Sequence, residues 1–239
     1  MVIVEKIKRI KEKHLFWGYR RVRAFLRKKH GLLVGKKLIR RLMKEHDLDV
    51  QRKRYKAKRT PMRSKPRPER KNEWWGSDMT KFYVNTVGWV YLVVVLDWYT
   101  KQVVGYSLGL RPTTDLWLEA LHMGVANACP LGSRSYAINL MTDNGSQPTS
   151  KKYESVIEDL GINHVTTSYS NPKGNADTER WCRTFKEEVI WPQEFYSWEE
   201  SASEVHQFVK FYNEEYPHST LNHMSPNEFD KQLDQAQAA

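Results

Sequence analysis

The sequence predicts an α/β protein: a mixed five-stranded sheet flanked by helices and preceded by a small all-α domain. Three observations carry this prediction. The first fifty residues show only helical spacing of apolar side chains. Residues 51–72 form a basic, proline-containing stretch without apolar periodicity. From Glu73 onward, strand-like and helix-like patterns follow in the order strand, strand, strand, helix, strand, helix, strand, helix, with no internal repeat.

Residues 1–50 are expected to form a helix-turn-helix DNA-binding region. Apolar residues recur at helical spacing in three short stretches, and Gly31 and Gly35 leave only a short connection between the last two. Short helices with a tight turn and basic outer faces are typical of this module. A small helical bundle that contacts proteins is the alternative interpretation. The candidate DNA contacts in this region are Arg20, Arg21, Lys36, Lys37 and Arg40.

Residues 51–72 are expected to form an extended linker that follows a phosphate backbone. The stretch contains eleven Lys and Arg and three prolines. It also marks a boundary, because the composition changes at Glu73. The candidate DNA contacts in the linker are Arg52, Lys53, Arg54, Lys56, Lys58 and Arg59.

The charge is divided unequally between the two parts of the chain. Residues 1–72 carry 27 Lys and Arg against 6 Asp and Glu, a net charge of +21. Residues 73–239 carry 12 against 22, a net charge of −10. Each Lys or Arg placed on a phosphate releases condensed counterions, so the first part has the composition of a polyanion-binding arm. The acidic part can hold metal-binding carboxylates.

Residues 73–239 are expected to form the second domain, which ends in a helical segment. The expected strands are 77–87, 89–96, 103–110, 137–142 and 162–165. The expected helices are 114–128, 150–160, 175–190 and 199–212, and a polar tail follows.

Several classes of protein are excluded by composition. Cys129 and Cys182 are the only cysteines, which argues against a disulfide framework and a cysteine-based zinc site. The longest apolar run, Val90–Leu96, has seven residues, whereas a membrane span needs roughly 20. The first residues lack the apolar core of an export signal. We therefore expect a soluble protein of the cytoplasm with no membrane partner.

Three acidic residues stand where surface charge is unusual. Asp78 lies in the opening of the first strand, Asp143 ends the fourth, and Glu179 lies in the first turns of the helix after Gly174. Any one of these residues alone is weak evidence for a catalytic site, since aspartate and glutamate also cap turns and helices. Together, three hard oxygen donors around one cleft could hold two Mg²⁺ or Mn²⁺ ions, as phosphoryl transfer on nucleic acids requires.

Two of the basic residues that follow Glu179 lie on the same face of the expected helix. Lys186 is seven residues further on, two helical turns, and therefore lies on the same face. Arg183 is one turn closer. Both are candidates to contact a DNA phosphate beside the metal ions, although an ordinary solvated lysine is the alternative for Lys186.

The motifs around these residues resemble a known family. They are Trp75-Gly76-Ser77-Asp78-Met79-Thr80, Thr142-Asp143-Asn144-Gly145-Ser146-Gln147, Asn171-Pro172-Lys173-Gly174-Asn175-Ala176-Asp177-Thr178-Glu179, Lys186-Glu187-Glu188, and Tyr212 to Leu221 with Ser225-Pro226. The opening Trp17-Gly18-Tyr19-Arg20-Arg21 also fits. The chain resembles the integrase-core transposases of bacterial insertion sequences, specifically the catalytic protein of the second of two overlapping reading frames.

The resemblance implies a ribonuclease-H-like core over residues 73–239 and a DDE triad of Asp78, Asp143 and Glu179. It also implies divalent-metal-dependent cleavage at the element end and strand transfer. The implied partners are double-stranded DNA, as the element's terminal inverted repeats and as target, further copies of the chain on that DNA, and the upstream-frame protein. Mg²⁺ and Mn²⁺ both remain open.

The chain departs from the family pattern at two places. Many members have Asp-Asn-Ala where this chain has Gly174-Asn175-Ala176, and a small residue where it has Arg180. Retroviral integrases begin with a His₂Cys₂ zinc domain, whereas residues 1–72 contain no cysteine. The alternative functions are a non-catalytic, domesticated DNA-binding regulator and a ribonuclease-H-type nuclease.

Overall fold

The computed structural model describes residues 2–50, 66–167 and 174–237, and it divides the chain into two compact units. One, here called the helical unit, comprises Met1–Pro61 and Glu214–Ala239. The other, here called the sheet unit, comprises Met62–Asn213. The six candidate DNA contacts of the linker, Arg52 to Arg59, lie outside the described residues.

The helical unit contains the three expected N-terminal helices, α1 (Val2–Lys13), α2 (Tyr19–His30) and α3 (Lys36–Glu45). The apolar positions that predicted them form a buried core of Ile7, Val22, Leu26, Ile39 and Met43. Gly31 ends α2 in the left-handed conformation, with φ 62°, which glycine adopts without the steric penalty of a side chain.

The C-terminal segment contains a 3₁₀ turn, η3 (Ser219–Leu221), and a helix, α8 (Pro226–Gln237). In the sequence, the residues after 212 were interpreted only as a polar tail, and α8 was not predicted. The start of α8 is a capping box: the Ser225 amide and hydroxyl donate to Glu228 Oε2 at 2.9 and 3.1 Å, and the Glu228 amide donates to Ser225 Oγ at 3.4 Å. Packing also groups this segment with the N-terminal helices, whereas composition had placed it in the second domain.

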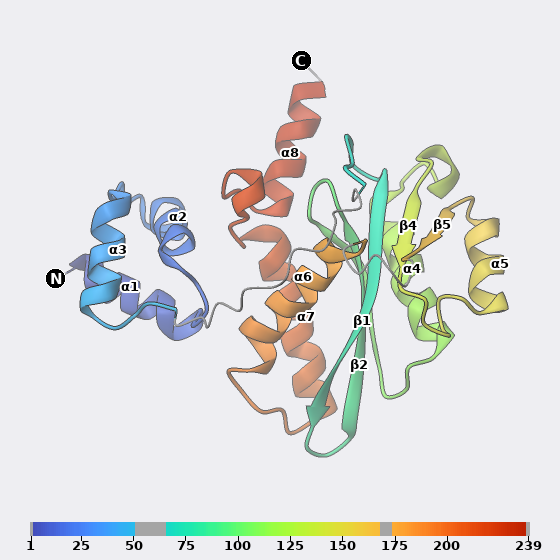
Figure 1. Cartoon of the computed structure of the whole chain (residues 1–239), viewed down its shortest axis with the longest axis horizontal. Helices are drawn as coiled ribbons and strands as arrows, with labels where there is room; N and C mark the ends of the chain where they lie inside the picture. The colour runs from blue at the N-terminus through green and yellow to red at the C-terminus, as the bar shows by residue number, and fades with distance from the viewer. Residues whose placement is uncertain (1, 51–65, 168–173, 238–239) are drawn as a thin grey trace, which may run out of the picture. The chain divides into compact units, whose positions relative to one another are not determined.

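The sheet unit is built on a mixed five-stranded sheet, as expected (Figure 1). Its strands are β1 (Trp74–Val84), β2 (Gly88–Asp97), β3 (Val103–Gly109), β4 (Asn139–Thr142) and β5 (Asn163–Thr166). The strand order is β3-β2-β1-β4-β5. β1 pairs antiparallel with β2 and parallel with β4, and so it is the central strand. β1 begins earlier than expected because Trp74, Trp75 and Gly76 pair with β4.

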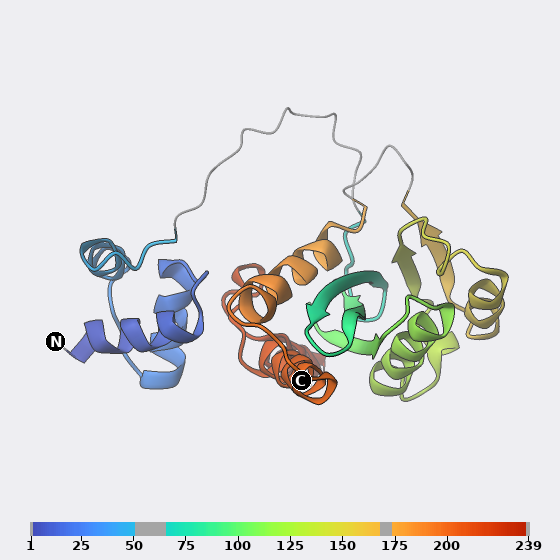
Figure 2. The same cartoon turned by 90° about the horizontal axis from the view of Figure 1, so that it is seen from below.

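Helices cover both faces of this sheet. In Figures 1 and 2, α4 (Thr114–Ala128) and α5 (Lys151–Asp159) lie on one side, and α6 (Ala176–Phe185) and α7 (Trp198–Glu214) on the other. A short 3₁₀ turn, η1 (Ser133–Ser135), precedes β4. The helix expected over 175–190 is divided, because α6 continues as one π-helical turn, η2 (Lys186–Ile190).

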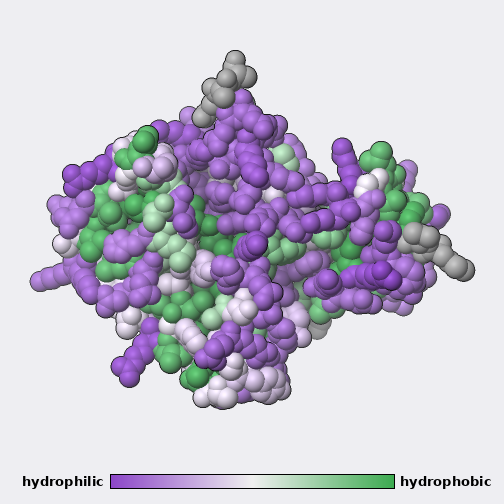
Figure 3. All heavy atoms as spheres, turned by 180° about the vertical axis from the view of Figure 1, so that it is seen from behind, coloured by the Kyte–Doolittle hydropathy of each residue, from purple (hydrophilic) through white to green (hydrophobic). Residues whose placement is uncertain are grey.

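The apolar core lies between β2 and its covering helices. Val93 and Val95 of β2 pack with Trp75 and the α4 residues Trp117 and Leu121, all essentially without solvent exposure. No described helix is both long and apolar enough to span a bilayer. On the face drawn in Figure 3, hydrophilic residues cover most of the surface and hydrophobic ones form scattered patches.

Candidate active site

Sheet register brings Asp78 and Asp143 together. On the parallel neighbours β1 and β4, Trp74 pairs with Asn139 and Gly76 pairs with Met141. Continuing this register by two residues places Asp78 opposite Asp143, the first residue after β4. Side chains at the same register of adjacent strands project from the same face, and adjacent strands lie about 4.8 Å apart. The two carboxylates are therefore neighbours, although 64 residues separate them in the chain.

Hydrogen bonds fasten the start of α6 to β1 and to Trp98, which directly follows β2, and thereby place Glu179. The buried Asn175 Nδ2 donates to the Ser77 carbonyl at 2.9 Å, and Trp98 Nε1 donates to Thr178 Oγ1 at 3.1 Å. Ser77 immediately precedes Asp78, and Thr178 immediately precedes Glu179. These two contacts therefore hold the third carboxylate beside the first.

This close approach of α6 to β1 requires a glycine at position 76. A Cβ there would lie 2.1 Å from Thr178 Oγ1, 2.3 Å from Trp98 Nε1 and 2.7 Å from Asn175 Oδ1. Such distances are far inside van der Waals contact. Sequence reasoning named Gly76, Asn175 and Thr178 only as parts of motifs and did not name Trp98, because the roles of all four depend on contacts between distant segments.

The electrostatics of Asp78 indicate that its carboxyl group is within range of the negative charges of Asp143 and Glu179. The pKa of Asp78 is raised to about 6, chiefly by burial and also by the negative charges of Asp143 and Glu179, while hydrogen bonds from the Met79 amide and the Cys182 thiol act in the opposite direction. That amide lies 2.8 Å from Asp78 Oδ1. Burial also raises the pKa of Glu179. Each carboxylate thus makes it harder for Asp78 to ionise, a repulsion that a bound cation relieves.

Asp143 is held by a local turn. The Gly145 amide donates to Asp143 Oδ1 at 3.0 Å, which is the turn that the sequence Asp143-Asn144-Gly145 predicts. Unlike Asp78, Asp143 is exposed to solvent, as is Glu179. The site therefore combines one half-buried and two accessible carboxylates.

A cavity of about 410 Å³ opens beside Asp78 and Glu179. Both basic residues expected on the same face as Glu179, Arg183 and Lys186, line it. Arg183 Nε is paired with Glu187 Oε1 at 3.0 Å. The remaining lining residues are Met79, Thr80, Cys182 and Trp191. The sequence did not indicate that Trp191 lines this cavity, because it follows a π-helical turn that the pattern of apolar residues does not predict.

Cys182 lies next to the carboxylates, but its environment does not favour reaction. It is buried, its thiol hydrogen-bonds to the Asp78 carboxylate, and burial raises its pKa well above the usual range, with the charge of Asp78 adding to the shift. Because the thiolate is the reactive form, the local environment disfavours nucleophilic chemistry at this sulfur.

Three carboxylates are the donor set that Mg²⁺ or Mn²⁺ prefers, and their mutual repulsion fits a cation site. Among the described residues, however, no group of three His, Cys, Asp or Glu side chains is already arranged as a set of metal ligands. The three carboxylates thus have the right chemistry for a divalent cation and are neighbours in the fold.

The candidate DNA contacts of residues 1–50 lie mostly at the surface of the helical unit. Arg20, Lys36, Lys37 and Arg40 are exposed. Arg21 is partly buried, with its guanidinium carbon 4.8 Å from the centre of the Tyr216 ring. Arg21 therefore also has a packing role.

Comparisons with known proteins agree with this geometry. Residues 68–172 and 160–226 each match a family described as "Integrase core domain", and residues 2–57 match one described as "HTH-like domain". The "Transposase for insertion sequence element IS904" of Lactococcus lactis is 29% identical over 244 residues, covering 96% of this chain and 94% of that protein. The "Insertion element IS600 uncharacterized 31 kDa protein" of Shigella sonnei is 29% identical over 235 residues, covering 93% and 84%.

A solved structure shows the same fold. The simian T-cell lymphotropic virus intasome structure, in complex with the PP2A regulatory subunit B56 gamma, contains a chain that superposes with a TM-score of 0.58 at 17% identity. The match covers 94% of this chain and 73% of that one.

Fold and site together define an enzyme of the DDE transposase and integrase class, with a ribonuclease-H-like core and an HTH-like domain before it. Enzymes with this core depend on divalent metal ions. The integrase core domain spans residues 68–226, and the relatives that match nearly the whole chain include an insertion-sequence transposase at 29% identity, which supports a DNA transposase function. The resemblance noted in the sequence is confirmed at this level.

Proposed function

We propose that Asp78, Asp143 and Glu179 are the catalytic triad of this transposase and hold two divalent ions, Mg²⁺ or Mn²⁺. The observation that carries the proposal is the proximity of three carboxylates that are distant in the sequence, two through strand register and one through the hydrogen bonds at the start of α6. The raised pKa of Asp78 supports it, because this carboxylate interacts with both of the others.

The reaction assigned to this site is cleavage at the element end followed by strand transfer. Water attacks the phosphodiester and frees a 3′-hydroxyl, which then attacks a phosphodiester of the target, forming one P–O bond as the target's own bridging oxygen leaves. When bound, the ions would activate the attacking oxygen and stabilise the leaving one. The three carboxylates provide the negative charge that keeps such cations in place.

Lys186 and Arg183 are assigned to the DNA phosphates beside the triad. Lys186 lines the cavity with Asp78 and Glu179. Arg183 lines it too, and its pairing with Glu187 fixes the direction of its guanidinium. Binding a phosphate through Arg183 therefore uses the nitrogens that Glu187 does not engage.

The substrate we propose is double-stranded DNA, both the terminal inverted repeats of the element and the target. The HTH-like domain supports this, because its exposed basic residues suit a phosphate backbone. We further propose that the chain assembles as an oligomer on that DNA, that the upstream-frame protein completes its end recognition, and that it acts in the bacterial cytoplasm on nucleoid DNA.

A strand-transfer assay tests this function directly. Labelled duplexes carrying the element's terminal repeats are incubated with the protein and Mg²⁺, Mn²⁺ or EDTA. Asp143→Asn and Glu179→Gln should lose nicked and joined products by at least a factor of a hundred while binding duplex within a few fold. Glu119→Gln, which neutralises an exposed carboxylate of α4 outside the site, is the matched control and should act as wild type.

Three results would decide against the proposal. Normal cleavage by Asp143→Asn would remove that residue from the triad. Binding with no product, even when the upstream-frame protein is fused to the chain, would favour the non-catalytic regulator. Preferential cutting of RNA–DNA hybrids would favour a ribonuclease-H-type nuclease.

A further inference from the structure

The C-terminal segment is an integral part of the helical unit. Tyr216 is 1% exposed, and its ring meets that of Trp17, 0% exposed, edge to face at 5.8 Å. Two ion pairs, each of 2.8 Å, add to this contact: Lys28 with Glu228, and Lys29 with Glu215. Aromatic packing of this kind supplies stability beyond the partly exposed ion pairs.

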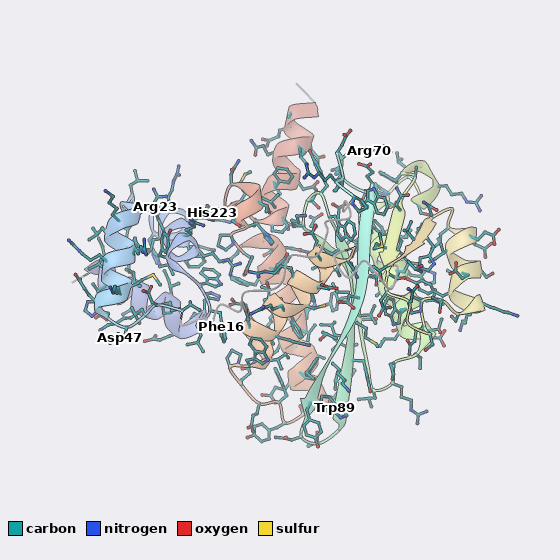
Figure 4. The ribbon with its side chains drawn as sticks, viewed as in Figure 1. Phe16, Arg23, Asp47, Arg70, Trp89 and His223 are labelled. Carbon is teal, nitrogen blue, oxygen red and sulfur yellow. The ribbon has the colours of Figure 1, made fainter. Side chains whose placement is uncertain are left out.

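Where this segment meets α2, a cavity of about 490 Å³ remains. From α2 it is lined by Arg23, Ala24, Arg27 and Lys28, and from the C-terminal segment by Asn222, His223, Met224 and Glu228. Figure 4 shows Arg23 and His223 close together, approaching from these two parts of the unit. The cavity thus exists only because the two ends of the chain pack together.

The cavity carries more positive charge than its own residues neutralise. Its single carboxylate, Glu228, is engaged by Lys28 and by the Ser225 amide and hydroxyl. Arg23 uses Nε to donate to the Val34 carbonyl at 2.8 Å, which orients the guanidinium and leaves its two terminal nitrogens. Arg27 makes no side-chain hydrogen bond or ion pair with the described residues. Two guanidinium groups therefore remain for an anion.

His223 supplies a neutral polar group to the same cavity. Its Nδ1 is buried and has no hydrogen-bond partner among the described residues. Burial lowers the pKa of His223, and the charges of Arg21, Arg23 and Arg20 lower it further, so the ring is neutral near pH 7. A buried nitrogen without a partner costs free energy, and a ligand oxygen would satisfy it.

We propose that this cavity binds a phosphodiester of duplex DNA, held by Arg23, Arg27 and His223, so that the segment after the sheet unit forms part of the DNA-binding unit. The proposal rests on the proposed function for its substrate. Guanidinium groups match phosphate oxygens in pairs, and an imidazole N–H adds a third donor. Duplex DNA is favoured over a free anion because the same unit presents Arg20, Lys36, Lys37 and Arg40 at its surface.

The test measures equilibrium binding of a labelled terminal-repeat duplex by fluorescence anisotropy at several salt concentrations. All measurements are made in EDTA, so that the result does not depend on the triad or on catalysis. Arg27→Gln removes one cavity charge. His223→Phe removes a donor without changing the charge. Arg9→Gln, an exposed charge of α1 outside the cavity, is the matched control. Circular dichroism shows that each variant keeps its helices.

Arg27→Gln should weaken binding about tenfold and reduce the slope of log affinity against log salt by about 0.9. His223→Phe should weaken binding roughly threefold to tenfold with an unchanged slope, because a neutral hydrogen bond is lost. Arg9→Gln should stay within about twofold of wild type. The neutral substitution is decisive, because a general attraction between DNA and a basic surface would not respond to it.

Wild-type affinity in His223→Phe, or an equal loss in Arg9→Gln and Arg27→Gln, would overturn the proposal. A titration with inorganic phosphate covers the other source of the ligand. Tight phosphate binding that Arg27→Gln abolishes, together with unchanged duplex affinity, would assign the cavity to a free anion and also overturn it. In both cases strand transfer by the wild type would still support the triad, so the two proposals fail separately.

Discussion

Replacing Asp78 with Asn should stabilise the sheet unit in the absence of metal ions. Burial and the neighbouring carboxylates raise the pKa of Asp78 from 3.8 to about 6 in the folded protein. The folded state therefore binds a proton more tightly than the unfolded state, and stability falls as pH rises between these two values. Asn has nearly the same shape, still accepts from the Met79 amide, and carries no charge at any pH.

The size of the effect follows from the shift. One pKa unit corresponds to about 1.4 kcal/mol, so ionised Asp78 destabilises the folded state by about 3 kcal/mol at pH 7.5. At pH 4.5 Asp78 is mostly protonated in the folded state, and the destabilisation calculated in the same way is about 1 kcal/mol. For a unit of this size, about 3 kcal/mol corresponds to roughly 6–12 °C in the unfolding midpoint.

The assay is thermal unfolding in EDTA at pH 7.5 and pH 4.5, with Glu119→Gln as control. Asp78→Asn should unfold at a higher temperature than wild type at pH 7.5, and the difference between the two midpoints should shrink by about two thirds at pH 4.5. Adding Mg²⁺ or Mn²⁺ at pH 7.5 should raise the midpoint of the wild type and change Asp78→Asn much less. A gap that is absent, or equal at both pH values, would refute the assignment of this repulsion to Asp78.

Three further outcomes follow from the contacts around the site and the C-terminus. Gly76→Ala should lower the free energy of unfolding by about 1–3 kcal/mol, measured by urea unfolding, because the added Cβ would clash with Thr178, Asn175 and Trp98. The same change should lower metal-dependent activity in the strand-transfer assay. Asn175→Ala should cost about 1–3 kcal/mol in the same urea experiment, because the buried Ser77 carbonyl loses its partner. Ser225→Ala should cost about 0.5–2 kcal/mol through the start of α8, seen by hydrogen exchange as faster opening of residues 226–236 with β1 and β2 unchanged. An unchanged exchange rate there would show that the capping box does not hold α8.

The sequence was sufficient to predict the sheet and to select the three carboxylates. The strand and helix patterns are local, and the order of elements restricts the topology to few choices. The pairing of Asp78 with Asp143 is different in kind, because it depends on β4 joining β1 rather than β3. Neither strand contains a signal for its neighbour. The resemblance selected the residues, and the register explains why they meet.

The start of α8 shows a signal that was present and overlooked. Ser225, Pro226 and Glu228 form the serine, first-turn proline and glutamate pattern of a helix N-terminus. The polar composition of the residues that follow outweighed it. Polar composition indicates only that a segment is exposed to solvent. The capping-box residues indicate where a helix begins, and for this short amphipathic segment they predicted the structure better.

Charge counting has a further limit, which the helical unit shows. Lys28 and Lys29 contribute to the basic character of α2 as much as Arg23 and Arg27 do, yet each lysine is paired with a glutamate of the C-terminal segment. Those pairings connect opposite ends of the chain and cannot be seen in any window of sequence. Because the sequence does not show which basic residues of α2 are already paired, the candidate DNA contacts chosen from it did not include Arg23 and Arg27. The cations that remain for DNA are set by which ones the fold has already neutralised, so the C-terminal segment determines where on α2 a phosphate can bind.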